Sequence, residues 1–231
     1  GLVVQPILPL GRALAQRTSN AAFGVVDGLA LIGTQAEVQR SAAPDQLQQV
    51  LADLGTLASD PSFQGRIVLV IGENGLDLAR QRGLGPLLKV GNWLGPVLVA
   101  AAEAGVRDLL LLGYHGKLIK LAGGIFHTHH HLADGRLEVL VALGLDVGLS
   151  ADQLLQLRGA SSVEEAFQAL DTNQARALGR YLAEMVERRS QSYVARYGDW
   201  SMRISAALFD RGRTLRWWGP EGEKRFFTLR D

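Results

Sequence analysis

Cysteine is absent from the 231 residues of this chain. Its absence excludes disulfide bonds, a cysteine nucleophile and thiolate metal sites together. The sequence therefore fits a reducing compartment, and any metal site would have to use histidine or oxygen ligands.

Long hydrophobic runs are also missing. The longest apolar run, Pro96–Ala102, stops at Glu103 and is far shorter than the ~20 residues of a membrane span. The apolar segment Leu2–Leu10 is interrupted by Pro6 and Pro9 and follows no basic region, so it does not have the pattern of a signal peptide. We therefore expect a cytoplasmic protein without a membrane partner.

Neither sign of charge dominates. The 24 lysines and arginines balance the 23 aspartates and glutamates, which leaves a formal net charge of +1. This balance argues against a nucleic-acid partner, and attraction for an anionic ligand would have to be local. The length and a hydrophobic content of 47% predict one α/β domain over residues 1–231, and homo-oligomerisation is left open.

Two widespread site motifs are missing as well. The residues after Ile71 do not form GxGxxG, so the dinucleotide-binding fingerprint is absent. The chain also contains no HExxH, the pattern of many hydrolytic zinc sites.

What is present first is an alternation of strand and helix patterns. The runs Arg66–Ile71, Leu87–Val90 and Asp108–Leu112 are typical of strands buried on both faces. Helical spacing lies around and between them, and a further strand is expected at Val25–Ile32. The alternation predicts a mainly parallel sheet with flanking helices over residues 1–148. The expected helices are Asp45–Leu57, Leu76–Gln81, Leu94–Ala104, Lys117–Phe126 and Leu132–Leu145.

The second half has a different pattern. A helical segment is expected over residues 149–198, with serines or Thr172 as the helix caps. A β-hairpin tail is expected over residues 199–231, formed by Met202–Phe209 and Thr214–Trp218, and Arg225–Leu229 could pair with it. The expected helices of the middle segment are Ala151–Leu157, Val163–Leu170 and Gln174–Tyr197.

Polar and glycine-rich segments follow the three predicted strands, and another follows the helix after the third strand. Ligands of parallel α/β sheets bind beyond the carboxyl ends of the strands, so these segments should converge there. Lys117 and Lys120 share a helix face, which for most lysine pairs is simply solvated. Because these two lie at a helix start next to the expected site, anion binding and a solvated face are left as equal alternatives. The converging segments are Gly72–Gly75, Gly91–Gly95, Gly113–Lys117 and Phe126–His131, with Asn20, Gly33 and Thr34 as a further edge.

All five histidines lie between His115 and His131. A metal site at His127–His131, with Asp134 or Glu138 as an oxygen ligand, is one interpretation, and a solvated polar loop is the other. Trp93, in one of the glycine-rich segments, could face a cation or a flat ring, or could simply pack.

These same segments resemble a known family. The run from Gly113 to His129 is similar to GHxGKLxKxAxGxxxTH, the signature of the cobalt-precorrin-5B C(1)-methyltransferase family. The helix start at Ala133–Glu138, the Lys89–Gly95 segment, the Gly72–Gly75 turn and the Asn20–Thr34 segment also resemble the family's sequences. Tyr114 departs from the family by replacing the histidine of GHxG, and Gly91 and the Asp27–Ala30 stretch depart too. The family also has an N-terminal domain with a TTGxCA stretch that this sequence lacks, so the chain is expected to be partial.

The resemblance implies methyl transfer from S-adenosylmethionine to ring carbon 1 of cobalt-precorrin-5B in anaerobic cobalamin biosynthesis. It implies a cobalt tetrapyrrole substrate, and a separate N-terminal domain or chain as a partner. The implied catalytic residues are His115 and His129. The implied cofactor-binding residues are Gly72, Asn74, Gly75, Asn92, Trp93, Gly95 and Gly113. The implied substrate-binding residues are Gly116, Lys117, Lys120, Thr128, Asp134 and Arg136, and no resident metal is expected.

Two alternatives remain at this stage. One is a metal-dependent hydrolase that uses the His127–His131 cluster. The other is a tetrapyrrole-binding module that binds the macrocycle without transferring a methyl group.

Overall fold

The computed structural model describes residues 7, 9–15, 44–129 and 134–228. The chain divides into two units, residues 1–40 and 41–231. In the first unit the described structure includes one short helix, α1 (Gly11–Ala15). The strand expected at Val25–Ile32 and the Asn20–Thr34 segment lie outside the described residues.

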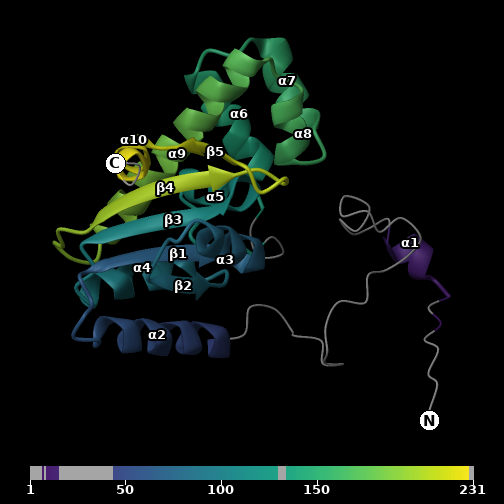
Figure 1. Ribbon diagram of the computed structural model, residues 1–231. Coiled ribbons are helices and arrows are strands. Elements are labelled where there is room, and N and C mark those ends of the chain that lie inside the picture. The colour runs from purple at the N-terminus through teal and green to yellow at the C-terminus, as the bar shows by residue number, and fades with distance from the viewer. Residues whose placement is uncertain (1–6, 8, 16–43, 130–133, 229–231) are drawn as a thin grey trace. The chain divides into compact units, whose positions relative to one another are not determined.

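A five-stranded sheet forms the centre of the second unit (Figure 1). Its strands lie in the order β2-β1-β3-β4-β5. The first four are parallel to one another and β5 is antiparallel to β4. The predicted fold class, a mainly parallel sheet with flanking helices and a C-terminal hairpin, is confirmed. The strands are β1 (Arg66–Ile71), β2 (Leu87–Val90), β3 (Asp108–Tyr114), β4 (Arg203–Phe209) and β5 (Leu215–Trp218).

Both faces of the sheet are buried, as the continuous apolar runs predict. On one face, Ile67, Leu69 and Leu111 belong to the larger core cluster. On the other face, Val70 and Leu112 pack with α3 (Gly72–Gln81) in a smaller cluster. The larger cluster is built with residues of α2 (Pro44–Ala58), α4 (Leu94–Glu103), α5 (His115–Ala122), α6 (Arg136–Asp146) and α9 (Thr172–Val194).

The predicted helical segment is present and its helices begin at side-chain caps. Ser150 caps α7 (Ala151–Gly159) by accepting a hydrogen bond from the Gln153 N–H. Ser162 caps α8 (Val163–Gln168) in the same way. The prediction of Thr172 as a cap is wrong, because the Asp171 carboxylate accepts from the first N–H groups of α9.

The C-terminal hairpin is part of the sheet. β4 pairs in parallel with β3 along its whole length, from Arg203 opposite Asp108 to Phe209 opposite Tyr114. The prediction that Arg225–Leu229 pairs with the hairpin is wrong, because residues 220–228 form α10 (Pro220–Thr228). Proline at the first helical position and two glutamates in the first turn both favour a helix there.

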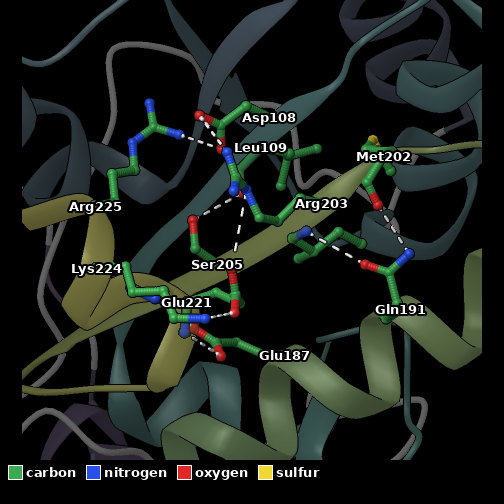
Figure 2. Close-up of polar contacts among 12 residues, drawn as sticks. Asp108, Leu109, Glu187, Gln191, Met202, Arg203, Ser205, Glu221, Lys224 and Arg225 are labelled. Atoms are coloured by element: carbon green, nitrogen blue, oxygen red, sulfur yellow. Dashed lines mark hydrogen bonds and ion pairs between the residues drawn. The ribbon is translucent and has the colours of Figure 1, made fainter.

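Side chains of α9 occupy the open edge of β4. The strand β5 pairs with β4 only as far back as Ala207, so within the described structure no strand covers the earlier part of β4 on that side. Gln191 accepts from the Ile204 N–H and donates to the Met202 carbonyl, while Glu187 accepts from the Ala206 N–H at 2.9 Å. Figure 2 shows both side chains extending from the helix toward the strand. Two helix residues one turn apart thus satisfy backbone groups of β4 that a neighbouring strand would otherwise bond.

None of the helices among the described residues is long and apolar enough to cross a membrane.

Candidate functional site

The topology of the sheet has a switch point at the carboxyl ends of β1 and β3, and we call this region, together with the loop after the neighbouring β2, the crevice. From β1 the chain passes through α3 to β2 on one side, and from β2 it passes through α4 to β3 on the other side. The connections leaving β1 and β3 therefore diverge, which is where open α/β sheets bind ligands. The predicted segments Gly72–Gly75 and Gly113–Lys117 lie at this position.

Gly72 and Lys117 come together at this crevice. The helix α3 begins at Gly72, earlier than the predicted Leu76, and Gly72 has a positive φ of 73°. A β-carbon on Gly72 would lie 4.0 Å from the Lys117 Nζ. The Lys117 side chain is exposed, but the protein around its amine lowers its pKa by desolvation. The start of α3 and this amine both favour an anionic ligand group, and Asn74 is exposed in the same helical turn.

The loop after β2 is tied to the segment after α5. The Thr128 N–H donates to the Asn92 carbonyl at 2.9 Å, and the Thr128 hydroxyl donates to Asn92 Oδ1 at 3.0 Å. The Gly95 N–H donates to the Phe126 carbonyl. Two segments that are far apart in the sequence thus form one side of the crevice, as the sequence predicts for Asn92 and Thr128.

Trp93 and His127 form the aromatic part of this wall. Their ring centroids are 4.5 Å apart and their planes are nearly perpendicular, at 86°. Trp93 Nε1 and His127 Nε2 are buried and have no hydrogen-bond partner within the described structure. Burial lowers the pKa of His127, and the neighbouring His129 and Lys120 lower it further. Two unsatisfied ring nitrogens next to the crevice are groups that a ligand could engage.

Lys120 has an internal role. The residue is only 1% exposed, and its ammonium donates to the Thr128 carbonyl at 3.1 Å. Burial lowers its pKa, while Asp134 opposes the shift. Lys117 and Lys120 therefore do not present equivalent ammonium groups, although they share a helix.

Most of the predicted binding glycines are needed for close packing. A β-carbon on Gly95 would lie 2.6 Å from the Tyr193 hydroxyl, and one on Gly116 would lie 2.5 Å from the Tyr114 ring. Gly75 faces the Leu112 carbonyl, and Gly113 faces Leu118. Among these glycines, Gly72 is the one whose position is next to a charged group of the crevice.

His115 lies in different surroundings from His129. It is 1% exposed, and its Nε2 is 2.9 Å from the Glu164 carboxylate of α8. Its ring contacts Phe167 and Trp217, which stack on each other. The hydrogen bond from His115 lowers the pKa of Glu164. A cavity of about 470 Å³ between α8, α9 and the hairpin is lined by His115 and Glu164 among others.

Sequence reasoning missed Glu164. The same carboxylate oxygen accepts weakly from the Tyr114 hydroxyl at 3.5 Å and from the Arg211 N–H at 3.2 Å. Burial and the Glu164 charge raise the pKa of Tyr114. Glu164 follows Tyr114 by fifty residues in a helix with ordinary composition, so no local pattern marked it.

Asp134 and Arg136 form a two-contact ion pair. The Arg136 Nε and Nη2 donate to the two oxygens of Asp134 at 2.7 and 2.8 Å. These bonds lower the pKa of Asp134 to about 2. Both side chains line a cavity of about 260 Å³ beside Ser161 and Ser162.

The hydrolase interpretation has no support from the described histidines. No group of three or more possible metal ligands occurs among the residues with described structure. His127 and His129 are neighbours with ring centroids 6.4 Å apart, whereas His130 and His131 lie outside the described residues.

Comparison with known proteins identifies the family. The model of the CbiD C-terminal domain matches residues 127–220, and the CbiD model matches residues 1–40. No solved structure matches. Proteins named cobalt-precorrin-5B C(1)-methyltransferase are 86% identical to this chain in Synechococcus sp. (strain CC9605), 76% in Parasynechococcus marenigrum (strain WH8102) and 63% in Prochlorococcus marinus (strain MIT 9313). The alignments cover 100%, 100% and 99% of this chain but only 63%, 65% and 61% of the relatives. The chain thus spans less than two thirds of the length of these relatives, and it belongs to the CbiD family.

Proposed function

We propose that this chain takes part in methyl transfer from S-adenosylmethionine to ring carbon 1 of cobalt-precorrin-5B, giving cobalt-precorrin-6A in anaerobic cobalamin biosynthesis. The observation that carries the proposal is the 86% identity over all 231 residues to a protein named for this reaction. The crevice at the carboxyl ends of β1 and β3 supports it, because predicted residues from several segments meet there.

Methyl transfer requires the protein mainly to position the methyl donor and the ring carbon. The ring carbon contributes an electron pair to the methyl group, a carbon–carbon bond forms, and the carbon–sulfur bond breaks with its electrons remaining on sulfur. The neutral thioether leaves without a proton, so no general base is needed for this step. Alignment of the reacting atoms can lower the barrier by several kcal/mol, up to ~10 kcal/mol.

The donor side of the proposed site is the start of α3 and the loop after β2. Gly72 and Asn74 suit the carboxylate of the donor, because they lie at a helix start, where backbone N–H groups favour an anionic group. The edges of Trp93 and His127 provide ring nitrogens without partners in the described structure for the remaining polar groups. Gly95 and Gly113 allow close packing around the site, whereas a β-carbon on Gly75 would make only ordinary van der Waals contacts.

The tetrapyrrole side faces a different set of groups. Its peripheral carboxylates would pair with cations, and the exposed Lys117 and the partly exposed Arg136 suit this better than the buried Lys120. Lys120 and Asn92 act indirectly by holding Thr128, and with it the neighbouring His129, in place. The 1% exposure of His115 favours an indirect role for it as well, through Tyr114 and Glu164.

The test is a calorimetric titration of the chelator-treated chain with S-adenosylhomocysteine. Saturable binding near one per chain supports a donor site within these residues and argues against the hydrolase. A folded chain that binds none would contradict the proposed donor site. The same titration of the full-length Synechococcus sp. (strain CC9605) relative then tells whether residues outside this chain complete the site or whether the donor assignment fails for the family.

A further inference from the structure

Positively charged side chains cluster at the amino ends of the parallel strands, opposite the crevice. Arg66, Asp108 and Arg203 are the first residues of β1, β3 and β4, and they are neighbours in register. Residues in register on parallel strands point to the same face, so these side chains lie side by side. Arg225 of α10 joins them from the C-terminal end of the chain (Figure 2).

One carboxylate faces three guanidinium groups in this cluster. Asp108 lies 3.1 Å from Arg225 and 3.8 Å from both Arg66 and Arg203. Burial lowers the pKa of Arg225, and repulsion by Arg66 and Arg203 lowers it further even though Asp108 opposes the shift. Asp108 therefore does not balance the positive charge around it.

The surface next to the cluster is hollowed. Two cavities of about 490 and 400 Å³ share Arg66, Asp108 and Arg203 in their walls. Arg107 adds a further guanidinium to the first cavity, and Lys224 and Glu221 line the second. The charged side chains of the two cavities are thus five cations and two carboxylates.

Two of the guanidinium groups that line the cavities leave donor capacity at the surface. Arg66 and Arg203 are 64% and 60% exposed, and their ion pairs of 3.8 to 3.9 Å are longer than hydrogen bonds. A guanidinium has five N–H donors in a planar fork that suits carboxylate and phosphate oxygens. Gly83 and Gly85 also line the second cavity.

We propose that this end of the sheet is a second binding site, for a small polyanion carrying at least two carboxylate or phosphate groups. One group binds between Arg66 and Arg203, and the other reaches Arg107 or Lys224 in the adjoining cavities. The site does not depend on the proposed methyl transfer, because it lies at the amino ends of the strands whereas the crevice lies at their carboxyl ends.

The experiment measures the binding of two probes, pyrophosphate and tricarballylate, to the whole chain at constant ionic strength by calorimetry. We expect saturable binding of at least one probe. Binding of pyrophosphate alone would assign the site to phosphates, and binding of tricarballylate alone would assign it to carboxylates. If neither probe saturates, the proposal is wrong.

A charge-matched pair of double variants tests where the probe binds. Arg66→Gln/Arg203→Gln should weaken binding by at least about tenfold, because two charge-assisted contacts are lost. The control Arg158→Gln/Arg189→Gln changes the net charge equally at exposed positions on α7 and α9 and should alter binding by less than about twofold. Equal losses in both variants would mean attraction to overall charge and would overturn the site.

A third variant predicts the opposite sign. Asp108→Asn removes the carboxylate that competes for the arginines, so probe affinity should rise by a few-fold. Weaker binding in this variant would contradict the proposal. A rise in affinity could not be caused by damage to the fold, which would only weaken binding. Binding of S-adenosylhomocysteine should be unchanged in the Arg66→Gln/Arg203→Gln variant, which separates this site from the proposed donor site.

Discussion

Glu187 is a buried carboxylate that joins three parts of the fold. It is 5% exposed and accepts from the N–H groups of Ala206, Glu221 and Gly222. It therefore closes the edge of β4 and holds the start of α10. The loss of such an acceptor leaves several backbone donors unsatisfied inside the protein.

We predict that Glu187→Ala lowers the free energy of unfolding by about 3 kcal/mol, measured by urea denaturation. Glu187→Gln keeps one acceptor oxygen and should cost less. The control Glu184→Ala removes only the exposed pair with Arg188 on the same helix, so its effect should stay within about 0.5 kcal/mol. Equal effects of Glu187→Ala and Glu184→Ala would contradict the role of Glu187.

The same residue should give the protein a pH-dependent stability. Burial raises the pKa of Glu187, although its three backbone donors oppose the shift. The folded state therefore binds this proton more tightly than the unfolded chain does. The contribution to stability is complete below the ordinary glutamate pKa of about 4.3 and declines as pH rises through the raised pKa. Glu187→Gln should abolish that decline in urea titrations at increasing pH, and an unchanged profile would contradict the prediction.

Lys117 should matter more for ligand binding than other lysines. We predict that Lys117→Ala weakens binding of a carboxylated cobalt tetrapyrrole roughly tenfold, whereas Lys89→Ala, which removes an exposed ion pair with Glu73, changes it little. Because desolvation lowers the pKa of Lys117, its charge and the binding should be lost at a lower pH than for an ordinary lysine. An affinity that falls equally in both variants would contradict this assignment.

Helix α9 contacts β5 through a glycine. A β-carbon on Gly179 would lie 2.2 Å from the Trp217 ring, and Trp217 in turn stacks on Phe167 beside His115. The helix, the hairpin and the surroundings of His115 therefore depend on one close approach.

We predict that Gly179→Ala lowers the free energy of unfolding by about 1–3 kcal/mol and alters the near-ultraviolet circular dichroism of the tryptophans, because the indole has to move. The matched control is Gly55→Ala in α2, where nothing lies within 4 Å of the new methyl group. That variant should be stabilised by roughly 0.5–1 kcal/mol. If Gly179→Ala is as harmless as Gly55→Ala, the packing described for α9 is wrong.

Most of the buried apolar residues described between positions 44 and 228 belong to the larger core cluster, and the smaller cluster lies on the other face of the sheet. The larger cluster contains Leu54 of α2, Leu111 of β3, Leu157 of α7 and Leu208 of β4. The helical segment at residues 149–198 is thus packed into the sheet unit and has no separate core of its own.

Unfolding of this unit should consequently be cooperative. We predict coincident urea transitions by far-ultraviolet circular dichroism, which follows the helices, and by fluorescence of the tryptophans. Separate transitions would mean that the helical segment unfolds independently, contrary to the expected single domain. A Glu164→Ala variant should leave the transitions coincident, because it removes the polar contacts of one carboxylate and leaves the shared apolar core intact.

Local patterns in the sequence determined the elements and part of the site. Short, mainly apolar runs identified β1 and β2 at their observed bounds, since strands buried on both faces are mostly apolar. Arg66 at the start of β1 and Lys89 in β2 are the exposed exceptions. The predicted convergence of Gly91–Gly95 with Phe126–His131 is confirmed by the hydrogen bonds between Asn92 and Thr128, although Thr128 follows a helix and not a strand. The sequence pattern also resembled the family that the comparisons identify.

Only the tertiary structure decided the partners that come from distant elements. The pairing of Glu164 with His115, the burial of Lys120 and the closing of the β4 edge by Glu187 depend on how α8 and α9 pack, and helix periodicity does not specify the neighbour of a face. The arginine cluster likewise arises from register, which places Arg66, Asp108 and Arg203 side by side although they lie far apart along the chain.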